Sequence, residues 1–116
     1  MSTVHYQPSR SAADSEQYVR GEHDERGVAV TCDVPGGPGE FAKRAQALAE
    51  SNGREVQVLH YRQSWSDKTF KAGNPEHEQR ANDMGYLLAK KMHPNADVLV
   101  VTHTDGKGRK VHNHIL

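Results

Sequence analysis

Cysteine is almost absent from this chain: Cys32 is the only one among 116 residues, so no internal disulfide can form. A reducing compartment is therefore the default expectation. Long apolar runs are missing too, since no stretch approaches the roughly 18–20 residues that span a bilayer. The N-terminus also lacks the charged and then apolar layout of a secretory signal. These absences predict a soluble cytoplasmic protein with no membrane partner.

An excess of positive charge is also missing, because 15 Lys and Arg balance 15 Asp and Glu. Proteins that bind nucleic acid through their overall charge are normally basic, so any affinity for DNA must come from a local site. Hydrophobic residues make up 34% of the chain and charged residues 26%, which is polar for a globular domain but short of the disordered class. The length suits one domain, or part of one, with a single core.

Local patterns predict an α/β fold in which strands and helices alternate. Alternating or β-branched runs predict strands at 2–7, 28–32, 55–65, 97–104 and from about 110 onward. Capping residues and apolar spacing predict helices at 11–21, 40–51 and 74–92. We expect a largely antiparallel sheet of about five strands with helices packed on it, its last two strands forming a hairpin. Because the chain ends while the last strand is running, we expect domain 1–116 to be incomplete at its C-terminus.

The helices carry start and stop signals and apolar faces. Ser9 or Ser11 is expected to cap the first helix, Gly21 to end it, and Asn74 before Pro75 to open the third. The residues expected to share one face of the second helix are Phe41, Ala45 and Leu48. Those expected on the buried face of the third helix are Ala81, Met84, Leu88 and Met92.

Histidine is abundant, with eight in the chain and three among the last fourteen residues. If the final hairpin turns on Lys107-Gly108, His103 lies opposite His112, and His114 lies opposite Val101. His112 and His114 share a face because strands alternate with period two. Three imidazoles then converge on one patch of sheet and leave a divalent ion open coordination positions, as a catalytic metal needs. A surface hairpin with solvent-facing histidines is the other interpretation, which the surrounding Val, Ile and Leu residues disfavour.

The stretch from Val98 to Asp105, followed by Val111-His112-Asn113-His114-Ile115, resembles the third motif of plasmid relaxases and mobilisation nucleases. These belong to the His-hydrophobic-His (HUH) endonuclease superfamily. The resemblance implies that His103, His112 and His114 hold a divalent ion, Mg²⁺ or Mn²⁺. Asn113 departs from the apolar residue in the superfamily's name, and the loop before His112 looks slightly long. The stretch from His60 to Trp65 is similar to the family too, so the resemblance covers most of the chain.

The resemblance also implies a function and a nucleophile. A metal-dependent endonuclease and transesterase of this kind nicks single-stranded DNA at a plasmid transfer origin during conjugative mobilisation, with accessory relaxosome proteins as partners. A tyrosine on an early helix attacks and keeps a 5′-phosphotyrosine link. Among the four tyrosines, Tyr18 near the end of a small polar helix is the candidate, and Tyr6 is the runner-up. Ordinary packing explains Tyr61 and Tyr86 adequately.

Several further residues near the histidines have two interpretations. Asp105 can orient a ligand imidazole or simply form the turn. Lys107, Arg109 and Lys110 form a basic cluster that can contact phosphate or lie in solvent, and Arg20 and Arg62 are weaker candidates for phosphate contact. Trp65 can stack on a base, although a core position suits it better.

Two other functions remain open. A metal-dependent phosphodiesterase that uses water as its nucleophile fits the same histidines, and only the role of Tyr18 separates it from a relaxase. The third hypothesis is an inactive relaxase fragment, because the chain ends while its last predicted strand is still running.

Overall fold

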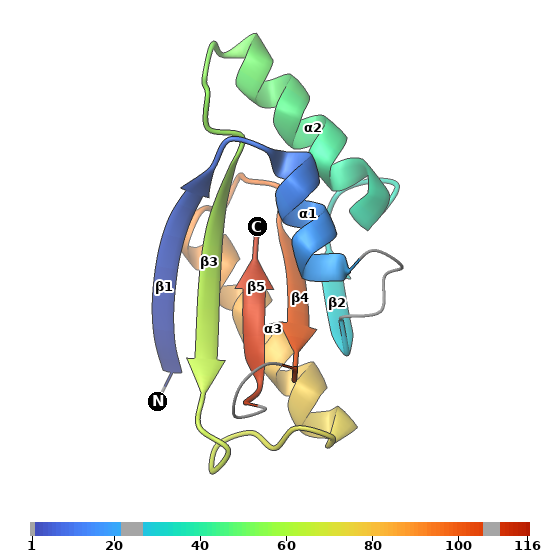
Figure 1. Cartoon of the computed structure of the whole chain (residues 1–116), viewed down its shortest axis with the longest axis vertical. Coiled ribbons are helices and arrows are strands. Elements are labelled where there is room, and N and C mark those ends of the chain that lie inside the picture. Colours follow the sequence, from blue (N-terminus) through green and yellow to red (C-terminus); the bar gives the residue numbers. More distant parts are fainter. Residues whose placement is uncertain (1, 22–26, 106–109) are drawn as a thin grey trace.

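The structure of the protein is a computed structural model that describes residues 2–21, 27–105 and 110–116. Within these residues, strands and helices follow one another in the order predicted from the sequence (Figure 1). They are β1 (Ser2–Ser9), α1 (Ala12–Arg20), β2 (Ala29–Cys32), α2 (Pro38–Ser51), β3 (Val58–Trp65), α3 (Pro75–Met92), β4 (Leu99–His103) and β5 (His112–Ile115). None of the described helices is long and apolar enough to cross a bilayer.

The strands form one sheet in the order β1-β3-β5-β4-β2, and every neighbouring pair is antiparallel. This confirms the predicted antiparallel sheet and its final hairpin, in which His103 lies opposite His112 and Val101 opposite His114. The last strand is central, since β3 and β4 both pair with it. It begins at His112 rather than near Lys110. The turn expected at Lys107-Gly108 lies outside the described residues.

Helices cover both faces of the sheet, with α1 and α2 on one side and α3 on the other (Figure 1). The alternation of β4 shows the two layers: Leu99 and Val101 pack with Val19 of α1, whereas Val100 packs with Ala89 of α3. All five residues of β4 are buried, as predicted for a strand covered on both faces. Trp65 is 3% exposed and packs against Phe70, which confirms its position in the core.

The predicted helix ends are confirmed at the first and third helices. Ser11 caps α1 by accepting a hydrogen bond from the backbone N–H of Asp14, and Gly21 ends it with φ 84°, a conformation that glycine adopts without strain. Asn74 caps α3 by accepting from the N–H groups of Glu76 and His77.

The predicted buried face of the third helix was partly wrong, since Met84 and Met92 of α3 are 47% and 39% exposed. In α2, Phe41 is buried whereas Leu48 is 49% exposed. In α3 the buried positions hold small or polar residues instead, namely Glu78, Ala81, Asn82, Gly85 and Ala89. The reason is close packing: a Cβ at Gly85 would overlap the side-chain amide of Asn113 in β5, so longer apolar residues cannot face the sheet there.

Three predicted boundaries also shift. The first strand continues through Pro8 to Ser9; β1 is an edge strand, where a missing N–H does no harm. The third strand starts at Val58 rather than Glu55, and the second helix starts at Pro38 rather than Glu40.

Candidate active site

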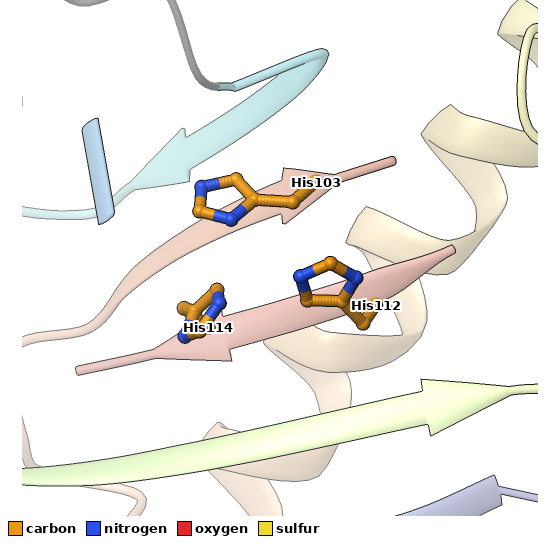
Figure 2. Close-up of side chains that lie close together, drawn as sticks. All are labelled: His103, His112 and His114. Atoms are coloured by element: carbon orange, nitrogen blue, oxygen red, sulfur yellow. The ribbon is translucent and has the colours of Figure 1, made fainter. Parts of the chain in front are cut away.

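Three histidines from β4 and β5 meet on the face of the sheet that α1 and α2 cover (Figure 2). His103 is 0% exposed, and His112 and His114 are each 4% exposed. Their ring centroids lie 4.5–5.3 Å apart. One ring nitrogen from each of the three lies within 4.8 Å of the other two. The structure thus brings together the three residues that the sequence singled out as metal ligands.

Each of these rings is oriented through one of its two nitrogens. His112 Nδ1 lies 2.9 Å from the carbonyl oxygen of Lys110, and His103 Nε2 contacts the carbonyl oxygen of Val19 in α1. Because a carbonyl oxygen only accepts, these contacts place the protons on those nitrogens and the lone pairs on the opposite ones. His114 Nδ1 lies 2.8 Å from Nε2 of His60 in β3.

The electrostatics of the cluster keep His114 neutral. Burial, together with the neighbouring His103, His60, His112 and Arg62, lowers the pKa of His114 to about 2. Burial and Arg62 also lower the pKa of His60. A neutral imidazole carries the lone pair with which histidine binds a metal.

The donor set fits a divalent metal ion. Imidazole nitrogens bind such ions at about 2.0–2.1 Å, so two ligand nitrogens on one ion lie at most about 4.2 Å apart. The 4.8 Å limit within the cluster needs only small rotations of the side chains to reach that range. One nitrogen of each ring is turned toward the other two rings (Figure 2), while protein groups hold the second nitrogen, as is usual for metal-binding histidines.

Tyr18 lies beside this cluster, on α1. Its ring centroid is 5.7 Å from that of His114 and 6.4 Å from that of His60. The side chain is 57% exposed and lines a cleft of about 680 Å³ that also contacts His114, His60 and Arg62. The tyrosine that the sequence favoured is therefore placed next to the histidines and reachable from solvent.

The remaining tyrosines point elsewhere. Tyr6 alternates with His5 along β1 and packs against Tyr61, with ring centroids 5.2 Å apart. The hydroxyl of Tyr61 lies 3.0 Å from His93, and that of Tyr86 donates to Asp33. Since neighbouring residues of a strand face opposite sides of the sheet, Tyr6 and Tyr61 lie on the face away from the histidines.

The other predicted site residues have mixed positions. Asp105 Oδ1 lies 3.7 Å from Nδ1 of His103, close enough to influence that ring. Arg20 forms an ion pair with Glu16 at 3.1 Å, which ties it to its own helix. Lys110 is exposed. Lys107 and Arg109 lie outside the described residues.

Asn113, between the two histidines of β5, belongs to a buried polar network on the opposite face. Its side-chain amide donates to Gln63 at 3.1 Å and to the carbonyl of Ala81 at 2.8 Å, and its oxygen accepts from Thr102 at 2.6 Å. Thr102 in turn accepts from Asn82 at 3.1 Å. An asparagine here therefore ties β5 to β3, β4 and α3, which explains why this position is not apolar.

Sequence reasoning assigned no role to His60 and only a weak one to Arg62. Both lie on β3, and Arg62 is the register partner of His114 on one side and of His5 on the other. Their proximity to the histidines depends on β3 pairing with β5. Only the motif-like stretch from His60 to Trp65 pointed toward them.

The structure thus places a tyrosine of a helix beside three histidines of an antiparallel sheet. A family model described as the nuclease domain of MobA/VirD2-like relaxases matches residues 15–116. The chain therefore belongs to this relaxase family, as its resemblance indicated.

Curated relatives agree with this family. Three proteins called "Protein rlx", all from Staphylococcus aureus, are each 28% identical to the chain over all of its 116 residues. The chain spans about a third of their length, 32% of one and 33% of the other two.

Proposed function

We propose that this domain nicks single-stranded DNA at a plasmid transfer origin and joins itself to the new 5′ end through Tyr18. The observation that carries the proposal is the position of Tyr18, whose ring lies 5.7 Å from that of His114 at the edge of the cluster. Family membership supports a role in DNA nicking. The transfer origin, the accessory relaxosome proteins and the cytoplasmic location remain predictions.

His103, His112 and His114 would hold the metal ion, through Nδ1 of the first and Nε2 of the other two. Mg²⁺ or Mn²⁺ is the ion that the resemblance implies, and Mg²⁺ ordinarily prefers oxygen ligands to imidazole. The chemistry that a bound ion supplies is polarisation of a phosphate oxygen and stabilisation of the charge that develops on it. Asp105 Oδ1 lies 3.7 Å from Nδ1 of His103, the nitrogen assigned here to the metal, so this carboxylate would lie beside the ion, while the carbonyl of Val19 holds the other side of the ring.

The nucleophile in this proposal is the hydroxyl of Tyr18. Its oxygen attacks the scissile phosphorus, the bond from phosphorus to the 3′ oxygen breaks, and the phenolic proton passes to the released 3′ oxygen. The products are a 5′-phosphotyrosine and a free 3′ hydroxyl. Because one phosphate ester replaces another, the strand can be rejoined by the reverse reaction.

Arg62 supports a path for the DNA strand across β3. It faces the cleft that Tyr18 and His114 line, and it pairs with no carboxylate among the residues described. By contrast, Arg10 pairs with Glu55 at 3.3 Å, and Arg20 pairs with Glu16. An exposed guanidinium next to the histidines is suited to a phosphate neighbouring the scissile one.

The direct test is covalent capture with a matched tyrosine control. A pool of single-stranded oligonucleotides labelled at the 3′ end is incubated with the protein and Mn²⁺, then run on a denaturing protein gel. We expect a labelled band at the mass of protein plus DNA, and none for Tyr18→Phe. Tyr6→Phe should keep the band, because Tyr6 is 56% exposed, as Tyr18 is at 57%, but faces the other side of the sheet.

The other outcomes identify the alternatives. Cleavage without a labelled protein band would mean that water is the nucleophile. Loss of the band in Tyr6→Phe but not in Tyr18→Phe would assign the nucleophile to the runner-up. Neither cleavage nor a band would favour an inactive fragment.

A further inference from the structure

His60 and His114 form a hydrogen-bond contact between two imidazole nitrogens. Nε2 of His60 lies 2.8 Å from Nδ1 of His114, and the two ring centroids are 5.0 Å apart. His60 is on β3 and His114 on β5, in adjacent strands of the sheet. The contact therefore reaches a proposed metal ligand from a strand that supplies no ligand itself.

As a hydrogen-bond partner of a histidine ring, another imidazole differs from a carbonyl group because it can donate as well as accept. The carbonyl oxygens beside His103 and His112 only accept, so they leave each of those rings a single proton arrangement. Two neutral imidazoles share one proton in two ways, because each ring can donate or accept. If His60 donates, the proton of His114 sits on Nε2 and blocks it. If His60 accepts, the lone pair of His114 sits on Nε2.

We propose that His60 is a positioning residue for the metal site: it accepts the hydrogen bond from Nδ1 of His114 and so presents the Nε2 lone pair of that ligand toward His103 and His112. This rests on the proposed function, since it takes the three histidines as the metal ligands.

The surroundings of the pair favour the neutral rings that this arrangement needs. His114 is buried and His60 partly buried, and this burial, together with the positive Arg62, lowers the pKa of each. Tyr18 also packs near both rings, with centroids 6.4 Å from His60 and 5.7 Å from His114. His60 thus contacts a proposed ligand, His114, and also lies close to the ring of Tyr18.

The test measures metal affinity, with variants that separate ring shape from hydrogen bonding. Mn²⁺ is titrated by calorimetry into metal-free wild type, His60→Phe, His60→Gln and His5→Phe. Phenylalanine keeps an aromatic ring but has no acceptor, whereas glutamine offers a carbonyl oxygen that can accept from His114. His5 lines the same cleft and serves as the control for a histidine lost from it.

We expect His60→Phe to raise the dissociation constant for Mn²⁺ about 10- to 100-fold, the usual range when a group behind a ligand is lost. His60→Gln should stay within about threefold of wild type, and so should His5→Phe. A second readout is the ¹⁵N spectrum of the imidazoles in the metal-free proteins. The Nδ1–H form of His114 should be dominant both in wild type and in His60→Gln.

Three results would overturn the proposal. Equal affinity of wild type and a folded His60→Phe would remove the positioning role while leaving the three-histidine site intact. A tenfold loss of Mn²⁺ affinity in His60→Gln, with the thermal unfolding temperature unchanged, would show that His114 does not need a hydrogen-bond acceptor at position 60. If His60→Phe does not fold, the result for His60→Gln tests the proposal by itself. Absence of Mn²⁺ binding in wild type would end this proposal together with the metal-dependent function.

Discussion

At the scale of single residues, the rings of the cluster have one nitrogen held by the protein and the other turned inward. Lys110, Val19 and His60 provide the outer contacts. Fixing a ring in this way reduces the entropy lost when it binds a metal, because the ligand atoms are already gathered. The protein can therefore assemble a three-nitrogen site from two short strands.

Removing two of the proposed ligands should weaken metal binding at least tenfold. We expect wild type to bind Mn²⁺ at one site per chain by calorimetry, and His112→Ala combined with His114→Ala to bind at least tenfold more weakly. The control is His77→Ala, which removes a histidine of α3 that packs against Phe70, outside the cluster. Thermal unfolding of the metal-free proteins checks that the double variant still folds. Equal binding by all three proteins would place the metal elsewhere.

At the scale of elements, the site depends on how closely α3 approaches the back of β5. Gly85 lies against Asn113, the residue between His112 and His114. Asn113 hydrogen-bonds to the carbonyl of Ala81 one turn earlier in the same helix. The helix α3 thus packs against one face of β5, and the proposed ligands His112 and His114 lie on the other face.

Adding one methyl group at this contact should destabilise the fold. Gly85→Ala would overlap the Asn113 amide, and overpacking of this kind costs about 1–3 kcal/mol in the free energy of unfolding. Gly39→Ala in α2 is the matched control, since nothing lies within 4 Å of its added Cβ. That change should be neutral or stabilise by up to about 1 kcal/mol. Urea unfolding measures both, and equal effects would argue against a tight contact at Gly85.

At the scale of the whole molecule, positive and negative charges balance. The cleft beside Tyr18 nevertheless contains Arg62, which forms no ion pair with a carboxylate among the residues described. Fifteen basic and fifteen acidic residues give no long-range attraction for DNA. In the proposed function, affinity for DNA would then come from a few local contacts, and Arg62 is our candidate for one of them. Arg62 lies between His5 and His114 in the sheet register.

Loss of this arginine should change how DNA binding depends on salt. Binding of fluorescein-labelled dT20 is followed by anisotropy at several salt concentrations, without metal. Arg62→Gln should bind several-fold more weakly and lower the slope of log affinity against log salt by about 0.7, the value for one phosphate contact on a single strand. Arg54→Gln, an exposed arginine on the loop before β3, should match wild type. If the slope of log affinity against log salt is unchanged in Arg62→Gln, Arg62 does not contact a phosphate and the proposed path of the DNA across β3 is wrong.

Much of the fold followed from local patterns, because caps, turns and alternation act over a few residues. Ser11, Gly21 and Asn74 mark helix ends by satisfying or terminating nearby backbone groups. The buried face of α3 did not follow, since periodicity alone favoured Met84 and Met92 over Gly85. Which stripe of a helix faces the sheet depends on the distance between the two, which no local pattern encodes.

The sequence by itself determined the order of the elements and the convergence of the three histidines, because a hairpin pairs residues close in the chain and alternation decides their face. It also favoured Tyr18 through the family that the chain resembles. Only the tertiary structure decided that Tyr18 lies against the cluster while Tyr6 faces away, and that His60 touches His114 across a separation of 54 residues. The physical reason is that the neighbours of β5 are set by the packing of the whole sheet, and contacts between distant segments form only when that packing is complete.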